Sequence, residues 1–372
     1  MDKSTLETDK QMKETKILRI AADQVESGIF SDGVNSALED AAEIIKCGGL
    51  VVFPTETVYG LGADGTNADA ARRIYAAKSR PSDNPLIIHI EKPEDAERYA
   101  HACELYYEFA RAFMPGPLTV ILPKKETVPL SVTGGLDSVA LRCPSHPVAR
   151  RLIGLAGVPV AAPSANISGR PSPTCAEHVI EDMMGRVDMI IDGGECDIGL
   201  ESTIIKIDNG TVTLLRPGGI TYDALSCITD SIAVASAVTE QLAKDARPLS
   251  PGMKYRHYAP NAPVVLLDGD EEDVIEFLRC RALESDCLIL CYTEETGLLP
   301  SDRVIDIGRM SDTQTQAHRL FSALRNADKL SPSVIYAHLP KKDGMGLALY
   351  NRMIRAAAHT VKYIPSGTKD AR

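Results

Sequence analysis

The chain has no apolar run long enough to cross a bilayer. Its 372 residues are 44% hydrophobic, but no stretch approaches the roughly 20 residues that a membrane-spanning helix needs. Residues 1–16 have mixed charge and no apolar core, which fits neither a secretory signal nor a transit peptide. We therefore expect a cytoplasmic protein without a membrane partner, whose residues 1–33 form a lead-in ahead of the fold.

Several common motifs are also missing. The nine cysteines are scattered and none forms a CxxC pair, which argues against a zinc ribbon or a redox motif and favours buried free thiols. There is no GxxxxGK[ST] loop, no HExxH, no GxSxG and no set of kinase motifs. A functional site must therefore be assembled from residues that are dispersed along the chain.

Positive charge is in short supply. The chain has 40 Lys and Arg against 51 Asp and Glu, a net charge of −11. This balance argues against broad electrostatic wrapping of nucleic acid, which needs a basic face. An acidic protein can still bind an anion such as ATP when a few cations are focused in one cleft. The position of each Lys and Arg in the loops therefore matters more than their number.

What the sequence does contain is an alternation of short apolar runs and amphipathic segments over residues 34–222. The runs at 50–53, 86–90, 118–122, 139–142, 158–162 and 188–191 predict strands, and the Asp-Asn-Gly turn at 208–210 predicts a hairpin between 204–207 and 212–215. Hairpins and Pro/Gly breaks interrupt the alternation. We expect an α/β domain built on a mixed sheet flanked by helices, rather than a doubly wound parallel sheet.

The composition changes after this domain. We expect a helix at 223–242 and then an ordered linker, because residues 247–263 hold four prolines and three basic residues. Residues 223–262 would form this helix and linker. A second α/β pattern begins at 263 and runs to 372, and it predicts a smaller Rossmann-like domain with a parallel sheet. No internal repeat or low-complexity tract is visible.

Four groups of polar residues stand out against this scaffold. In the first, Lys78 and Arg80 follow a helix and precede Asn84 and His89. Such cations suit either the solvated C-terminus of a helix or a phosphate clamp, and the nearby donors favour the clamp. In the second, Arg142 ends an apolar strand, where burial demands an anionic partner. That partner could be a structural Asp or a ligand carboxylate.

The third group, Pro163 to Gly169, places small hydroxyl and amide side chains after a strand, which suits either a ligand crevice or a plain turn. The fourth flanks the predicted hairpin, whose two ends would bring Ser202 and Arg216 together, unless Arg216 is an incidental loop residue. In the tail, the segment 344–346 could form an anion-binding nest or simply begin a helix.

Seven blocks along the chain carry a resemblance. They are PTETVYGLG (54–62), KSRPSDNPL (78–86), PGPLTVIL (115–122), ALRCPSHP (140–147), APSANISGRPSPT (162–174), LESTII (200–205) and LLRPGG (214–219). In this order they resemble the threonylcarbamoyl-AMP synthase family, the YrdC-type enzymes. The linker SPGMKYRHYAP (250–260) and the tail resemble the long, two-domain form. The carbamoyl-transfer relatives of hydrogenase maturation share the core but add zinc-finger segments, for which this chain lacks the CxxC pairs.

The resemblance implies a fold and a reaction. The fold is a YrdC-like open twisted mixed sheet flanked by helices, catalytic over 34–222, plus the smaller Rossmann-like domain. The reaction is a nucleotidyl transfer that converts L-threonine, bicarbonate or CO2, and ATP into threonylcarbamoyl-AMP and pyrophosphate. A separate complex then transfers the group to the adenosine next to the tRNA anticodon. The substrate supplies the nucleophile, so the protein contributes positioning and charge neutralisation.

The same resemblance assigns residues to each substrate. The threonine and carbamate pocket would be formed by Thr57, His89, Arg142, Ala162 and Ser202. ATP would be held by Lys78, Arg80, Asn84, Ser138, Ser164, Asn166, Ser172 and Arg216, with Lys78 and Arg80 nearest the phosphates. Tyr255 and His257 would belong to a lid that keeps water from the carbamate. Mg²⁺ would accompany the triphosphate, since no all-protein metal cage is visible.

Two rival functions remain open at this stage. One is a double-stranded RNA-binding module with a regulatory tail, and the net charge counts against it. The other is a carbamoyltransferase that uses carbamoyl phosphate. Pyrophosphate release that needs both threonine and bicarbonate would separate the synthase from both. The synthase itself could still make weak contact with tRNA or double-stranded RNA.

Overall fold

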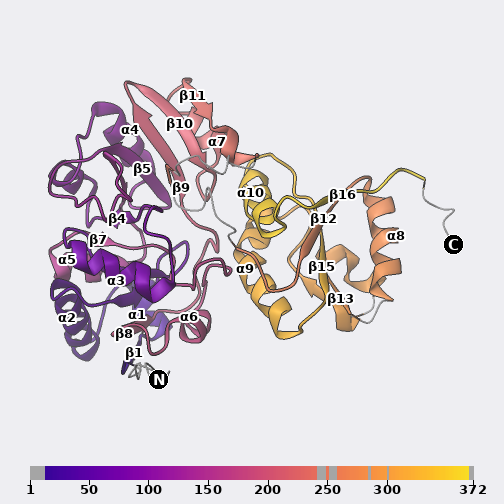
Figure 1. Ribbon diagram of the computed structural model, residues 1–372, viewed down its shortest axis with the longest axis horizontal. Coiled ribbons are helices and arrows are strands. Elements are labelled where there is room, and N and C mark those ends of the chain that lie inside the picture. The colour runs from indigo at the N-terminus through magenta and orange to yellow at the C-terminus, as the bar shows by residue number, and fades with distance from the viewer. Residues whose placement is uncertain (1–12, 241–248, 251–257, 284–285, 300, 368–372) are drawn as a thin grey trace, which may run out of the picture.

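The computed structural model describes residues 13–240, 249–250, 258–283, 286–299 and 301–367, and these form two α/β domains (Figure 1). The strands of the first domain are β1 (Lys16–Arg19), β2 (Val51–Phe53), β3 (Gly60–Asp64), β4 (Ile87–His89), β5 (Leu118–Pro123), β6 (Ser138–Arg142), β7 (Val160–Ala161), β8 (Met189–Asp192), β9 (Thr203–Asp208), β10 (Thr211–Arg216) and β11 (Ile232–Val234). They hydrogen-bond in the order β1-β8-β2-β3-β7-β4-β6-β5-β9-β10-β11. Parallel and antiparallel pairs alternate irregularly, so the prediction of a mixed sheet is confirmed.

Helices cover both faces of this sheet. They are α1 (Ala22–Ser27), α2 (Asp32–Lys46), α3 (Ala68–Lys78), η1 (Pro93–Arg98), α4 (Glu104–Phe113), α5 (Pro147–Ala156), α6 (Ala176–Met183), α7 (Tyr222–Ser226) and η2 (Ser236–Val238). Helices α2 and α5 pack on one face around Leu38, Ile45 and Leu152. Helices α3, α4 and α6 pack on the other around Ile74, Phe109 and Val179. The sheet is therefore buried between two helical layers, which leaves its strand ends as the exposed positions for a site.

The predicted lead-in at 1–33 was too long. Strand β1 pairs in parallel with β8 over four residues, from Lys16 opposite Met189 to Arg19 opposite Asp192. Helix α1 follows, and α2 begins at Asp32 because the Ser31 side chain accepts a hydrogen bond from the Val34 amide. The described part of this segment is thus an edge strand and a short helix of the first domain.

The predicted helix at 223–242 was also wrong. Helix α7 ends at Ser226, and β11 then pairs in parallel with β10 from Ile232 opposite Val212. The β-branched residues Ile232 and Val234 favour a strand at this place, and the 3₁₀ turn η2 follows at once. The first domain therefore extends beyond residue 222, into the segment 223–262 predicted as helix and linker.

The second domain has the predicted parallel sheet. Its strands are β12 (Val264–Asp268), β13 (Cys287–Cys291), β14 (Val304–Asp306), β15 (Val334–His338) and β16 (Val361–Tyr363), in the order β14-β13-β15-β12-β16, and all four strand pairs are parallel. Its helices are α8 (Glu271–Ala282), η3 (Thr293–Leu298), η4 (Ser301–Arg303), α9 (Thr313–Lys329) and α10 (Gly346–Ala356). Helix α10 begins at Gly346, and no side chain in the described part of the chain caps it.

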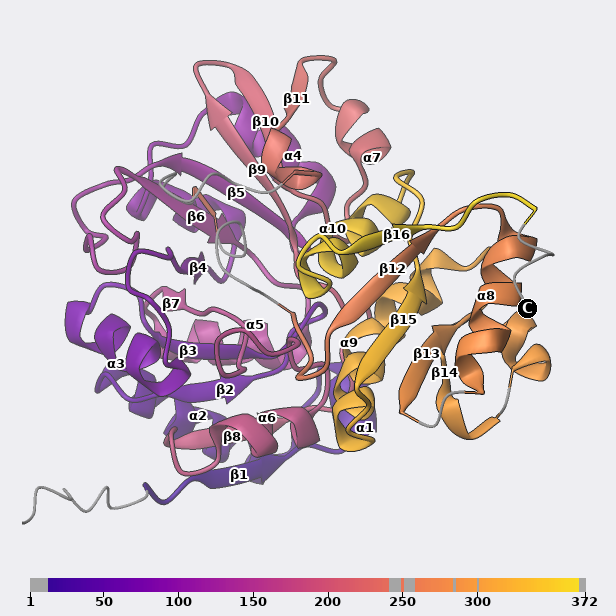
Figure 2. The same cartoon turned by 45° about the vertical axis from the view of Figure 1, so that its right-hand side comes forward.

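Helices α9 and α10 lie between the second sheet and the first domain (Figures 1 and 2). One apolar cluster spans the junction, with Val58 and Leu200 from the first domain and Phe321 and Met353 from the second. Hydrogen bonds cross as well, because the Asn351 side chain donates to the Val238 carbonyl at 2.6 Å. The two domains are thus packed together through apolar and polar contacts.

All nine cysteines are free thiols. No helix in the described ranges combines the length and the apolar character that a membrane span requires.

Candidate active site

A cavity opens where several strands of the large sheet end. Its walls come from the loop after β2, the start of β3, the loop after α3, the ends of β4, β6 and β7, the two ends of the β9–β10 hairpin, and one residue of the predicted linker. The lining residues are Thr55, Val58, Tyr59, Gly60, Arg80, Ile87, His89, Arg142, Ala162, Pro163, Ser164, Glu201, Ser202, Arg216 and Tyr258. Three arginines therefore share one cavity in a chain of net charge −11, which is the focusing of cations that the composition required.

Arg142 lies at the end of β6 and is 4% exposed. Its Nη2 donates to Glu56 Oε1 at 2.7 Å, so a structural Glu, rather than the Asp that we had considered, pairs with the guanidinium. Glu56 is fixed in turn by the Ser145 amide at 3.2 Å. The buried Nε of Arg142 has no partner among the described residues. The guanidinium is thus anchored at one edge and still has a donor for an anionic ligand.

His89 ends the neighbouring strand β4, opposite Arg142 in the parallel register. Burial lowers the pKa of its imidazole to about 3, and the positive charge of Arg142 acts in the same direction. Its ring stands edge-on to Phe53 at a centroid distance of 6.1 Å, and Nδ1 has no partner within the described chain. At neutral pH the imidazole is uncharged, so it suits a hydrogen-bonding role rather than that of a base.

The hairpin brings Ser202 and Arg216 together, as predicted. Arg216 donates through Nη2 to Ser202 Oγ and through Nε to the Ser202 carbonyl, both at 3.1 Å. The Ser202 hydroxyl also meets Thr119 Oγ1 at 2.7 Å. Burial lowers the pKa of Arg216 to about 10, which leaves it charged at neutral pH. This wall of the cavity therefore carries a fixed positive charge.

Glu201 lines the same wall, and the sequence predicted no role for it although it begins the polar group before the hairpin. Burial alone would raise the pKa of its carboxyl group, but Arg352 and Arg216 outweigh that effect and lower it. Arg352 lies on α10 of the second domain and donates through Nε to Glu201 Oε2 at 2.8 Å. The other carboxylate oxygen accepts the Ser172 hydroxyl. A buried Glu beside Ser202 in the block LESTII was the available signal, because an unpaired carboxylate is costly there.

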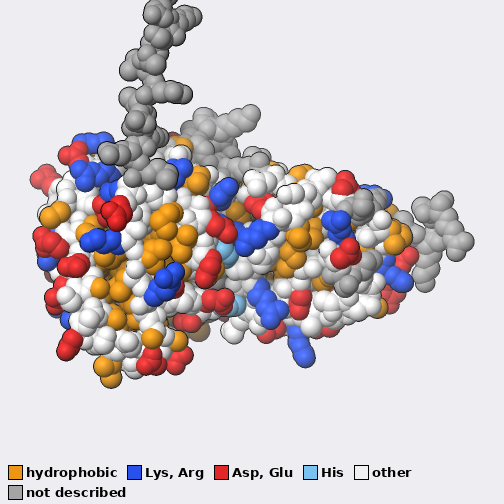
Figure 3. Space-filling view, turned by 90° about the horizontal axis from the view of Figure 1, so that it is seen from below, with side chains coloured by type: hydrophobic (Ala, Val, Ile, Leu, Met, Phe, Trp, Pro, Cys, Tyr) orange, Lys and Arg blue, Asp and Glu red, His pale blue; other side chains and the backbone are white. Residues whose placement is uncertain are grey.

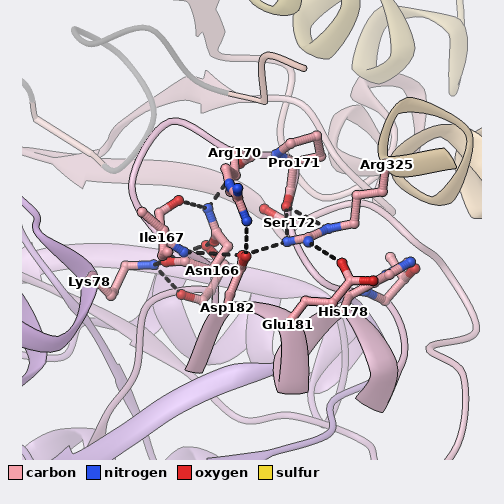
Figure 4. A network of polar contacts seen from close by, with 12 residues as sticks. Lys78, Asn166, Ile167, Arg170, Pro171, Ser172, His178, Glu181, Asp182 and Arg325 are labelled. Atoms are coloured by element: carbon pink, nitrogen blue, oxygen red, sulfur yellow. Dashed lines mark hydrogen bonds and ion pairs between the residues drawn. The ribbon is translucent and has the colours of Figure 1, made fainter. Parts of the chain in front are cut away.

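Lys78 is the last residue of α3 and is only 1% exposed. Ser79 adopts a left-handed conformation, with φ of 52°, and ends the helix there. The Lys78 ammonium donates to the carbonyl oxygens of Ser164 and Asn166 (Figure 4). Burial, followed by the charge of Arg80, lowers its pKa. The interpretation of this basic turn as a solvated helix end is therefore wrong, because Lys78 and Arg80 are both buried.

Arg80 lines the cavity itself. Its guanidinium donates to the carbonyl oxygens of Asn84 and Pro85, at 3.3 Å and 3.1 Å from Nη2. Burial lowers its pKa to about 10, so it too remains charged at neutral pH. Lys78 thus supports the loop at 164–166, while Arg80 presents charge to the cavity.

The predicted site residues fall into two groups, those that line the cavity and those that do not. Seven predicted residues line the cavity: Arg80, His89, Arg142, Ala162, Ser164, Ser202 and Arg216. Six others are not among its lining residues: Thr57, Lys78, Asn84, Ser138, Asn166 and Ser172. Thr57 contacts the lining residue Thr55 through their hydroxyls at 2.9 Å, and Asn166 Oδ1 accepts Ser164 Oγ at 2.5 Å. Ser138 lies at the opposite end of β6 from Arg142.

The predicted lid residues Tyr255 and His257 lie outside the described residues. Tyr258, which follows them, lines the cavity and is 3% exposed. Its ring stacks on Phe321 of α9 at 5.2 Å. The Ala259 amide donates to the Gly169 carbonyl at 2.9 Å. The described end of the predicted linker therefore reaches the cavity and contacts both domains.

The residues that the structure describes contain no group of three or more His, Cys, Asp or Glu side chains that could hold a metal ion.

Comparison with known proteins agrees with this geometry. A family described as "Telomere recombination" (Sua5_yciO_yrdC) matches residues 43–218, and "Threonylcarbamoyl-AMP synthase, C-terminal domain" matches residues 220–358. The threonylcarbamoyl-AMP synthase of Pyrococcus abyssi is 45% identical over 331 residues, which cover 86% of this chain and 94% of the relative. The chain belongs to the threonylcarbamoyl-AMP synthase family.

A second relative and a solved structure match most of the chain as well. The threonylcarbamoyl-AMP synthase of Bacillus subtilis is 42% identical and covers 87% of this chain and 94% of its own length. The solved structure of P. abyssi Sua5 complexed with L-threonine has a TM-score of 0.83 at 39% identity, covering 94% of this chain and 99% of that chain. The enzyme family and the two-domain fold are thus shown, and the double-stranded RNA-binding alternative is not favoured.

Some relatives are shorter. The threonylcarbamoyl-AMP synthase of Pseudomonas putida strain KT2440 is 35% identical over 182 residues, which cover 49% of this chain but 97% of the relative. This relative therefore matches about half of this chain over nearly its own full length.

Proposed function

We propose that this chain forms threonylcarbamoyl-AMP and pyrophosphate from L-threonine, bicarbonate or CO2, and ATP. The observation that carries the proposal is the cavity in which Arg142, Arg80 and Arg216 face a space lined by hydroxyls and a neutral imidazole. A relative of the same two-domain fold has been solved with L-threonine bound. Family membership therefore agrees with a cavity suited to anionic substrates.

In our proposal the threonine carboxylate binds Arg142, whose Nε is free of partners among the described residues. His89, Thr57 through Thr55, the Ala162 backbone and Ser202 would surround the amine and the carbamate. Because the pKa of His89 is about 3, the imidazole would orient the carbamate by hydrogen bonding and would not take its proton. The threonine amine attacks CO2 and loses a proton, and the carbamate oxygen then attacks the α-phosphorus.

The nucleotide would lie toward Arg80 and Arg216, with pyrophosphate leaving as the oxygen–phosphorus bond forms. Ser164 would contact the nucleotide, while Lys78, Asn84, Asn166 and Ser172 would act mainly by holding these contacts in place. This positioning role is our proposal for residues that do not line the cavity. No nucleophilic side chain is required, because the carbamate is the nucleophile.

Mg²⁺ is part of the proposal as the companion of ATP. The one carboxylate that lines the cavity, among the described residues, is Glu201, and Arg352 and Ser172 already occupy its two oxygens. The ion would therefore be held by the triphosphate oxygens and bound water, and it would offset charge on the leaving pyrophosphate.

The product would pass to a separate tRNA-modifying complex that acts on the adenosine next to the anticodon. Basic and acidic side chains are interspersed over the face of the molecule in Figure 3. That face thus resembles an ordinary mixed surface more than a nucleic-acid groove.

The decisive experiment follows pyrophosphate release and product mass with ¹³C-bicarbonate as the carbon source. We expect release that requires threonine, bicarbonate and ATP together, and a product that carries the label. Release without bicarbonate, or labelled product only from carbamoyl phosphate, would overturn the proposal. Double-stranded RNA binding without any turnover would favour the rejected alternative.

A further inference from the structure

Two arginines of the second domain are buried inside the first. Arg325, on α9, is 4% exposed at its side chain, and Arg352, on α10, is fully buried. Each pairs with a buried carboxylate of the first domain, Asp182 for Arg325 and Glu201 for Arg352. Burying a charged group is costly, so a buried Arg is normally paired with a carboxylate and its remaining N–H groups are hydrogen-bonded.

Arg325 holds the loop between β7 and α6. Its Nε and Nη2 donate to the Pro171 carbonyl at 3.2 Å and 2.7 Å, and Nη2 also reaches Asp182 Oδ2 at 2.7 Å (Figure 4). Asp182 accepts from the Ile167 amide at 3.2 Å and from Arg170 Nη1 at 2.6 Å. The middle of this loop, from Ile167 to Pro171, is therefore held by one ion pair that spans the two domains.

Arg352 reaches the next residue of the same loop by another route. Its guanidinium donates to Glu201 Oε2 at 2.8 Å, to the Glu201 carbonyl at 3.2 Å and to the Pro217 carbonyl at 2.8 Å. The other carboxylate oxygen of Glu201, Oε1, accepts a hydrogen bond from the Ser172 hydroxyl. Arg352 also lies over the Tyr258 ring, 5.6 Å from its centroid. Helices α9 and α10 thus converge on Pro171 and Ser172.

These contacts lead to the nucleotide side of the cavity. Asn166 Nδ2 donates to the carbonyl oxygens of Ile167 and Arg170 at 2.9 Å, and the Asn166 carbonyl accepts from Lys78 at 2.6 Å (Figure 4). On the other side of the cavity, Arg142 and His89 have their contacts within the first domain. Arg142 is held by Glu56, and its strand pairs with that of His89.

We infer that Arg325 and Arg352 are positioning residues through which the second domain fixes the segment 166–172 for ATP. Neither arginine lines the cavity, so neither is catalytic. The inference rests on the proposed function, because Asn166 and Ser172 were assigned to ATP there. It gives the second domain a specific role, support of the nucleotide half of the site, while Arg142 and His89 of the threonine half are held by contacts within the first domain.

The test uses the full chain with Arg325→Lys and Arg352→Lys, singly and together. Lysine keeps the positive charge beside the buried carboxylate but cannot reproduce the planar fork of donors. We expect the KM for ATP to rise about tenfold to 100-fold, as for a displacement of roughly 1 Å, while the KM for threonine changes less than about twofold. The matched control is Arg319→Lys, on the same helix α9. That side chain is 48% exposed and pairs with Asp306 inside the second domain, so both KM values should stay as in the wild type.

A second measurement separates positioning from general stability. If Arg352 acts through Glu201 on Ser172, then Arg352→Lys should raise the KM for ATP much less in a Ser172→Ala background than in the wild type. Should Arg352→Lys fail to fold, Ser172→Ala alone must still raise the KM for ATP selectively. Equal rises in both KM values, a lower Tm with unchanged KM values, or the same effect in Arg319→Lys would each overturn the inference. Absence of threonine-dependent turnover in the wild type would instead reject the proposed function.

Discussion

Arg142 shows how a single side chain can be both structural and available to a ligand. Its Nη2 is committed to Glu56, while its Nε has no partner in the described residues. The sequence alone could predict that a buried Arg needs an anion, since VALRCP is otherwise apolar. It could not name Glu56, because that contact depends on how the β2–β3 loop folds over the end of β6.

Replacing Arg142 tests its role toward threonine. Arg142→Met combined with Glu56→Gln removes the pair without leaving a buried charge. A charged hydrogen bond is worth about 1.5–3 kcal/mol, so we expect the KM for threonine to rise by about tenfold to 100-fold. Steady-state pyrophosphate release at varied threonine and at varied ATP measures both constants, with Glu56→Gln alone as the control. A threonine KM that stays at the wild-type value would rule out this assignment.

His89 gives a prediction for pH. Burial lowers its pKa to about 3 from an ordinary 6.5. Between these values the unfolded state binds more protons than the folded state, so the free energy of unfolding falls as the pH falls. From pH 6.5 to pH 5.0, protonation of His89 in the unfolded state should lower the free energy of unfolding by about 1.5 kcal/mol. Urea unfolding of the wild type and of His89→Gln at both pH values measures the difference, and an equal pH dependence in the two proteins would contradict it.

At the scale of elements, long periodic segments were predictable and short edge elements were not. The runs at 86–90 and 118–122 contain β4 and β5, and each has four apolar residues in five, which favours a buried strand. Strand β1 lies in a charged stretch, and β11 has only three residues. Both form at an edge of the sheet, where pairing with β8 or β10 outweighs weak local preference.

Strand β1 can be tested with two neighbouring prolines. The Lys16 and Ile20 amides donate to the carbonyl oxygens of Asp188 and Asp192, at 3.0 Å and 2.9 Å. The alternation of a parallel ladder therefore directs the Leu18 amide to β8 and the Ile17 amide away from it. Leu18→Pro should lower the free energy of unfolding by about 1–3 kcal/mol through the lost hydrogen bond. Ile17→Pro, on the outward side, should change it much less. Chemical denaturation of both variants decides, and equal losses would argue against this register.

At the scale of the whole molecule, the sequence predicted two domains but not their contact. Arg325 and Arg352 gave no signal, because each sits in an amphipathic helix where an Arg is ordinarily solvated. Their partners Asp182 and Glu201 lie more than 140 residues away. Such pairing depends on the relative placement of two complete domains and cannot be obtained from local pattern.

The closeness of the junction is testable at Gly199. A Cβ atom there would lie 2.5 Å from the His318 Cα atom of α9, whereas one at Gly194 would have nothing within 4 Å. Both glycines have positive φ, 75° and 87°, so alanine should strain both backbones by about 1 kcal/mol. Gly199→Ala should lose about 1–3 kcal/mol more through overpacking. Scanning calorimetry measures the Tm of both variants. Similar Tm values would contradict the prediction, because they would show that α9 moves to accommodate the methyl group without loss of stability.

The buried ion pairs at the junction also limit how such enzymes can be recombined. If the second domain were exchanged for one from a relative without arginines at these two places on α9 and α10, Asp182 and Glu201 would each lose a counter-charge. A functional chimera would need those carboxylates changed together with the grafted domain. The two arginines and their acidic partners must therefore be exchanged together, although they belong to different domains.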